Sequence, residues 1–156
     1  MLQRIQSIYL FLVFVFAILF VMLPLAHFPA EAPDIPFRLS KYNVFFDALG
    51  IVSIRWLALL LLGLFALAVL LTVYTSFQYK NRLLQIRLGK YNMLVHAALI
   101  LVAFFLTDNL RNQVHDAGFS YGAGVFFPVI SLIFILLANR AIKKDEELVR
   151  SADRIR

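Results

Sequence analysis

Residues 56–79 read WLALLLLGLFALAVLLTVYTSFQY, and no Lys, Arg, Asp, Glu or His interrupts this stretch. A helix rises about 1.5 Å per residue, so a run of this length covers the hydrocarbon core of a bilayer, which is roughly 30 Å thick. Trp56 and Tyr79 lie where aromatic side chains anchor a helix at the two membrane interfaces. The stretch therefore predicts a membrane-spanning helix.

Three further apolar runs, at 7–27, 91–107 and 121–139, predict three more spans. The run at 7–27 is longer than the core of a secretory signal peptide, and Pro33 follows the one Ala-x-Ala candidate, so we expect an uncleaved helix. Hydrophobic residues make up 62% of the chain and charged residues 15%, against about 25% charged in soluble domains. We predict an all-α membrane protein, a four-transmembrane-helix bundle that forms a single domain over residues 1–156.

The basic residues predict the orientation of this bundle. Most lie at 1–6, 80–90 and 140–156, whereas the segments 28–55 and 108–120 hold only Arg38, Lys41, Arg55 and Arg111. Basic residues concentrate on the cytoplasmic side. We therefore expect both termini, the loop 80–90 and the tail 140–156 in the cytoplasm, and 28–55 and 108–120 as outer loops. The net charge of +6 then fits anionic lipid headgroups better than nucleic acid.

The outer loop 28–55 is the one long connection. Its partly alternating stretch Phe37–Phe46 predicts a strand, Asp47–Gly50 a turn and Ile51–Arg55 a second strand, which together would form a short β-hairpin. An amphipathic surface helix is the alternative. After Asn139 the residues are polar and helix-favouring without Gly or Pro, which predicts that the fourth helix continues as a cytoplasmic extension.

His96 is the one ionisable side chain well inside a predicted span, and Asn92 lies one turn before it. Such groups are costly in a membrane, so they are candidates for an intramembrane polar site. The structural alternative is a hydrogen bond from His96 to Thr72, Thr75 or Ser76 on the neighbouring helix. The three histidines lie at different depths, which excludes bis-histidine haem. We predict no catalytic residue, no metal site and no cofactor.

Small residues mark a possible helix-packing or partner interface. The segment Tyr121–Gly124 opens the fourth predicted span, with a bend expected at Pro128, and Gly63 and Ala66 of the second span could oppose Gly122 and Gly124. Basic residues form the second candidate surface, for a protein partner or for anionic lipid: Lys80, Arg82, Arg87, Lys90, Arg140, Lys143, Lys144 and Arg150.

Several motifs resemble those of a Bacteroidota family of small four-helix membrane proteins, a domain of unknown function. They are the first ten residues (MLQRIQSIYL), Lys80–Arg82 with 85–88, the Tyr121–Gly124 segment with Pro128, and above all 137–142 with 145–154. The resemblance covers nearly the whole chain and implies the inner membrane of a Gram-negative cell. It supplies no catalytic residues.

The predicted spans carry no Asp, Glu, Lys or Arg, which disfavours ion-coupled transport by a single copy. We therefore expect a non-catalytic accessory or scaffold subunit of an inner-membrane complex, which contacts a membrane-protein partner or a second copy of itself. The alternative is a small permease or an oligomeric pore for a small solute. A membrane enzyme or redox subunit is the weakest hypothesis.

Overall fold

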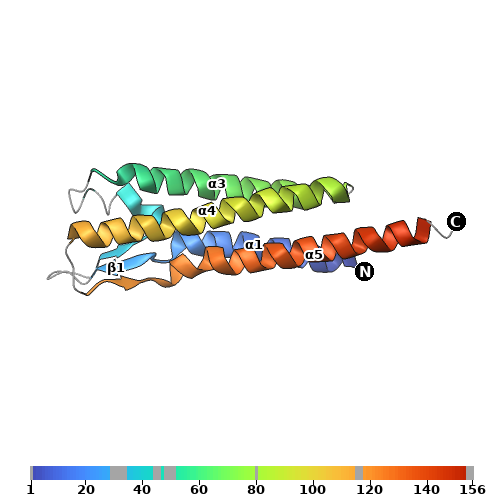
Figure 1. The fold of residues 1–156 in the computed structure, drawn as a ribbon. Coiled ribbons are helices and arrows are strands. Elements are labelled where there is room, and N and C mark those ends of the chain that lie inside the picture. Colours follow the sequence, from blue (N-terminus) through green and yellow to red (C-terminus); the bar gives the residue numbers. More distant parts are fainter. Residues whose placement is uncertain are drawn as a thin grey trace.

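The computed structural model describes residues 2–28, 35–43, 47, 52–79, 81–114 and 118–153. It contains four long helices: α1 (Leu2–Met22), α3 (Arg55–Phe77), α4 (Arg82–Val114) and α5 (Phe127–Asp153) (Figure 1). All four are long and apolar enough to cross a membrane. The predicted set of four apolar helices is thus confirmed and is compatible with a multi-pass membrane protein.

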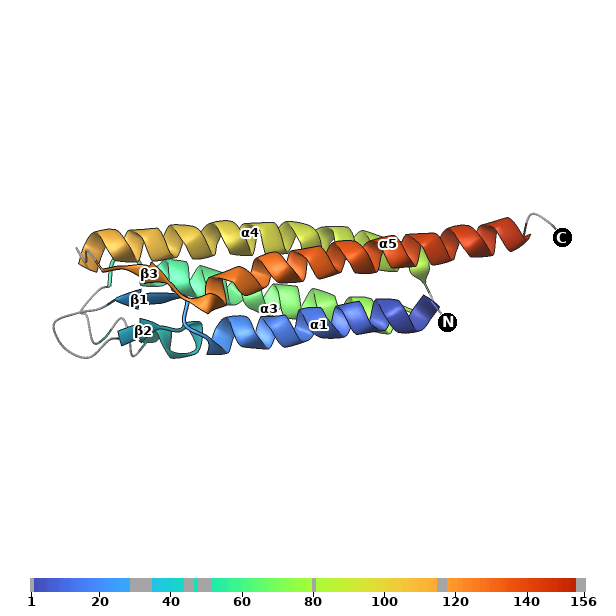
Figure 2. The ribbon, with the colours of Figure 1, turned by 90° about the horizontal axis from the view of Figure 1, so that it is seen from below.

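The helices pack as an antiparallel bundle in which α1 lies against α5, α5 against α4, and α4 against α3. The N- and C-terminal ends of the chain lie at the same end of the bundle, which we call the terminal end, and a small sheet lies at the other, the sheet end (Figure 1). Helix α5 projects beyond the other helices at the terminal end, as a second view confirms (Figure 2).

The sheet end is closed by three short antiparallel strands, β1 (Ala26–Phe28), β2 (Ile35–Phe37) and β3 (Ser120–Tyr121), in the order β2-β1-β3. Ala26 pairs with Phe37 on one side and with Tyr121 on the other. Helix α1 stops before Pro24, since proline lacks the N–H of a helix and disfavours helical backbone in the residue before it. The chain then continues as a strand whose Ala26 and Phe28 are buried.

The hairpin predicted within 37–55 is wrong. Of the described residues in its first strand (37–43), only Phe37 belongs to a strand, Leu39–Lys41 form a 3-10 helix, and α3 starts at Arg55. Phe37 and Leu39 are both fully buried. The alternating pattern therefore comes from two inward-facing side chains, one at the end of a strand and one in a tight 3-10 turn. The predicted turn falls largely outside the described residues. The sheet instead uses Ala26 and His27, which we had assigned to the first span.

Several predicted helix bounds also differ from the structure. Helix α4 begins at Arg82 and not at 91, and it continues to Val114, so most of the predicted loop 80–90 and the first half of 108–120 are helical. The fourth long helix starts at Phe127 rather than 121 and runs to Asp153, which confirms its continuation past Asn139. Hydropathy marks the apolar part of a helix, whereas backbone hydrogen bonding continues into amphipathic turns on either side.

Candidate functional site

One face of α4 carries buried polar residues in the terminal half of the bundle. Gln85, Asn92 and His96 are 1 to 3% exposed, and Gly89 is buried between them. Residues spaced by three, four or seven lie on one face of a helix. The same face continues towards the sheet end with buried apolar residues, Leu99, Ala103, Leu106 and Leu110. The half of the interior near the terminal end thus holds a polar set, which we call the polar column (Gln85, Asn92, His96, Thr72 and Thr75). The other half is largely apolar, and its buried Thr107 hydroxyl donates to the Ala103 carbonyl of the same helix.

Asn92 links α4 to α3. Its Nδ2 donates to Thr72 Oγ1 at 2.8 Å, and the Thr72 hydroxyl donates to the Ala68 carbonyl at 2.8 Å. Because the single hydroxyl proton is used in that second bond, Thr72 Oγ1 can only accept from Asn92, which determines the orientation of the amide. Asn92 Oδ1 therefore points elsewhere, and it is buried without a hydrogen-bond partner among the described residues.

Gln85 repeats this arrangement one level closer to the terminal end. Its Nε2 donates to the Thr75 backbone carbonyl at 3.2 Å, an oxygen that can only accept. Gln85 Oε1 is likewise buried without a partner in the described part of the chain. The polar column therefore presents two carbonyl oxygens, on successive levels of the bundle, that can each accept a hydrogen bond from a donor.

His96 bonds to its own helix, so the partners predicted for it are wrong. Its Nδ1 lies 2.9 Å from the Asn92 carbonyl, and Asn92, not His96, contacts Thr72. Since the carbonyl only accepts, Nδ1 carries the proton and Nε2 is left as the acceptor of the neutral ring. Thr75 and Ser76 bond to carbonyls of α3 itself. The His96 ring also lines a cavity of about 10 Å³ that Ser131 and Pro128 of α5 border.

Helices α4 and α5 approach closely at Gly89. A Cβ atom at this position would overlap the Asn139 side chain, whose Nδ2 contacts Met93 Sδ at 3.6 Å. We did not predict either Gly89 or Asn139. The available signal was a lone glycine in a basic, amphipathic segment together with a polar residue at the end of an apolar run.

Gly122 and Gly124 lie outside the four long helices: Gly122 precedes a short 3-10 helix, η2 (Ala123–Phe126), and Gly124 is part of it. Their N–H groups donate to the carbonyls of Leu25 and Pro24, both at 2.9 Å, and a Cβ atom on either glycine would overlap the Pro24 carbonyl. They therefore allow the segment before α5 to pack on the end of α1. Pro128 is the second residue of α5, where its missing N–H has no partner to lose, so the bend predicted there is not required.

Gly63 and Ala66 do not oppose these glycines, contrary to the prediction. Both are exposed on α3, and no atom lies within 4 Å of a Cβ built on Gly63. They form part of an outward surface whose large members include Leu59, Leu60, Leu67 and Leu70.

The predicted basic surface divides into paired and exposed members. Arg82 Nη2 lies 3.2 Å from Asp145 Oδ2, and Arg82 Nη1 donates to the Asp145 carbonyl, which holds the start of α4 to α5. Lys143 lies 3.8 Å from Glu147 on the surface. The remaining members with described side chains are exposed: Arg87, Lys90, Arg140 and Lys144. Lys80 and the Arg150 side chain lie outside the described part.

The chain was compared with known proteins. The family described as "Domain of unknown function (DUF4293)" matches residues 2–155. A comparison with curated proteins finds no match.

Proposed function

The chain belongs to this family of unknown function, and we propose that it is a non-catalytic accessory or scaffold subunit of a bacterial inner-membrane protein complex. In this proposal the four apolar helices cross the membrane and the terminal end faces the cytoplasm. The terminal end supports that orientation because it carries Arg82, Arg87, Lys90, Arg140, Lys143 and Lys144.

One observation carries the subunit hypothesis: α5 extends past the bundle (Figures 1 and 2), and its last turns carry exposed apolar side chains. Leu148 is 50% and Val149 42% exposed, although they follow the charged residues that mark the membrane surface. Lipid chains do not reach that position, so both side chains face water unless a protein covers them. Val149 also lines a groove with Leu83, between Arg82 and Glu146. Such a mixture of apolar and charged groups is typical of a protein interface.

The outward face of α3 gives further support. Gly63 and Ala66 are small exposed residues on the same helix as several large exposed leucines, and nothing lies within 4 Å of a Cβ built on Gly63. Small residues let a second transmembrane helix approach closely, which is how helices associate inside a membrane. In our proposal this face and the α5 extension contact the same partner, one within the membrane and one at its cytoplasmic surface.

The test is gentle extraction of the tagged protein at native expression level, followed by sizing and mass spectrometry of the particle. We expect a stoichiometric partner that is lost from the Leu148→Gln/Val149→Gln variant. The matched control is Val52→Gln, because Val52 is 71% exposed at the sheet end. Since all three side chains face outward, the variants should keep the thermal stability of the parent chain. A particle that contains this chain alone would contradict the subunit hypothesis.

The polar column supports a second candidate, a small permease or oligomeric pore. The carbonyl oxygens of Gln85 and Asn92, which have no partner in the part of the chain that the structure describes, could bind a small hydrogen-bond donor that enters from the terminal end. Within one copy the buried Leu99, Ala103 and Leu106 block the way to the sheet end. A path through the membrane would therefore have to form between copies. Liposomes that contain the purified protein and pass no small solute would exclude this candidate.

A further inference from the structure

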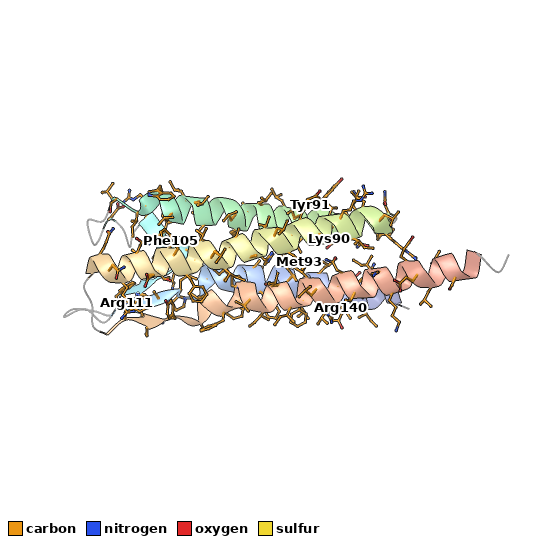
Figure 3. All side chains as sticks on the ribbon, viewed as in Figure 1. Lys90, Tyr91, Met93, Phe105, Arg111 and Arg140 are labelled. Carbon is orange, nitrogen blue, oxygen red and sulfur yellow. The ribbon has the colours of Figure 1, made fainter. Side chains whose placement is uncertain are left out.

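An apolar groove runs along the seam between α4 and α5. It is lined by Lys90, Met93, Leu94 and Ala97 of α4 and by Leu132 of α5, and its volume of about 400 Å³ is within the range of ligand pockets. Its exposed lining is apolar throughout, so Lys90 contributes the methylene groups of its side chain and not the ammonium group. Lys90 is the lining residue nearest to the terminal end of the bundle, where Figure 3 labels it near Met93.

A second basic residue, Arg140, lies on the same side of the seam as Lys90. Gly89 touches Asn139 across the seam, so the next residues, Lys90 and Arg140, turn away from that contact by about 100° each. Because the two helices are antiparallel, both turns lead to the same side of the seam. Lys90 and Arg140 are both exposed there, as Figure 3 shows, with Met93 beside them.

These two cations have no acidic counterpart among the described residues. Neither forms an ion pair, whereas the nearby carboxylates of Asp145 and Glu147 pair with Arg82 and Lys143. Two like charges on one side of a seam repel each other, so an anion between them is favoured. The ligand that fits this surface is thus negative at one end and apolar along its length.

We propose that the groove binds one anionic phospholipid, with its phosphate between Lys90 and Arg140 and an acyl chain along Met93, Leu94, Ala97 and Leu132. The two positive charges should favour a lipid with a net negative charge over a zwitterionic lipid, and the apolar lining should favour a lipid over a free anion. This site lies on the α4–α5 seam, away from Leu148, Val149 and the α3 face that the proposed function assigns to a protein partner. The lipid site can therefore be tested independently of that partner.

The experiment is native mass spectrometry of the purified full chain in detergent, titrated with phosphatidylglycerol or phosphatidylcholine. We expect retained phosphatidylglycerol and little phosphatidylcholine. A Lys or Arg near an anionic lipid contributes about 1 kcal/mol, which is roughly fivefold in affinity, so Lys90→Gln/Arg140→Gln should lose about 30-fold. Ala97→Phe keeps both charges and fills the groove, so it should also weaken binding by about tenfold or more, because the acyl chain loses its apolar contacts there.

The control for charge is Lys41→Gln/Arg111→Gln, which removes the same two charges from exposed residues at the sheet end. It should bind phosphatidylglycerol like the parent chain. Circular dichroism and thermal melting confirm that each variant is folded. Equal loss in this control, or equal retention of both lipids by the parent, would show general surface adsorption and overturn the site. Displacement of the lipid by millimolar inorganic phosphate, or normal binding by Ala97→Phe, would show a site for a free anion instead.

Discussion

Replacement of Asn92 by Leu should stabilise the bundle, although it removes a 2.8 Å hydrogen bond between helices. Interhelical hydrogen bonds in membrane proteins contribute about 0.6 kcal/mol on average. The same substitution also removes Asn92 Oδ1, a buried oxygen without a partner among the described residues, and such a group costs about 1–3 kcal/mol. Thr72 keeps its bond to the Ala68 carbonyl, so no donor is left unpaired. The expected net gain is about 1 kcal/mol.

Thr72→Val is the opposite case, and it serves as the matched comparison. The Asn92 amide then loses its acceptor while it stays buried, so the variant should lose about 1–3 kcal/mol. The free energy of unfolding can be measured by denaturant titration in mixed micelles. A change of 1 kcal/mol corresponds to roughly 2–4 °C in Tm for a chain of this size.

The reasoning is refuted if Asn92→Leu destabilises the protein by 1 kcal/mol or more. That result would mean that Asn92 Oδ1 accepts a strong hydrogen bond from a molecule bound inside the polar column. It would favour the permease or pore over the subunit hypothesis. A neutral result for both variants would show that the terminal half of the bundle is hydrated enough for water to replace either partner.

Three other changes test the packing. Gly89→Leu should cost about 1–3 kcal/mol because its side chain overlaps Asn139, and Asn139→Gly in the same chain should restore most of the Tm. Gly122→Ala should cost a similar amount, read from the Tm, because its Cβ would overlap a backbone carbonyl that cannot move aside; an unchanged Tm would contradict this contact. The double-mutant cycle of Arg82→Ala and Asp145→Ala should give a coupling free energy of about 0.5–1 kcal/mol that falls with added salt. A coupling that is independent of salt would mean that the pair acts through packing.

The four helices could be predicted because hydropathy is a local property: each span is a run of apolar residues that needs no knowledge of its neighbours. The bounds of α4 could not, since its first turns, from Arg82 to Lys90, and its last turns, up to Val114, are amphipathic and read as loops. The sheet was missed for a different reason. Ala26 and Phe28 continue an apolar run, and their strand is defined by pairing with Tyr121, far along the chain.

The members of the polar column were predicted except for Gln85, but their contacts were not. His96, Asn92 and Thr72 were recognised as polar residues in apolar surroundings, yet the bond belongs to Asn92 because its amide reaches α3 while the His96 ring turns back to its own helix. Gly89, Asn139 and Gln85 were missed, because the sequence alone placed them at or beyond the membrane surface. The contact between Gly89 and Asn139 follows from the close approach of α4 and α5, and Gln85 contacts α3, so both depend on the assembled bundle.

The small sheet determines the order in which the chain can be completed during synthesis. Helices α3 and α4 are joined by the short connection between Phe77 and Arg82, so this hairpin can pack as soon as its second half has been inserted. Strand β1 can pair with β2 soon after it is made, but β3, its second partner, and α5, the main packing partner of α1, are made last. Until the final quarter of the chain has been made, α1 therefore lacks the surface against which most of its contacts form. In a newly made protein, α1 is the long helix that waits longest for its main packing partner.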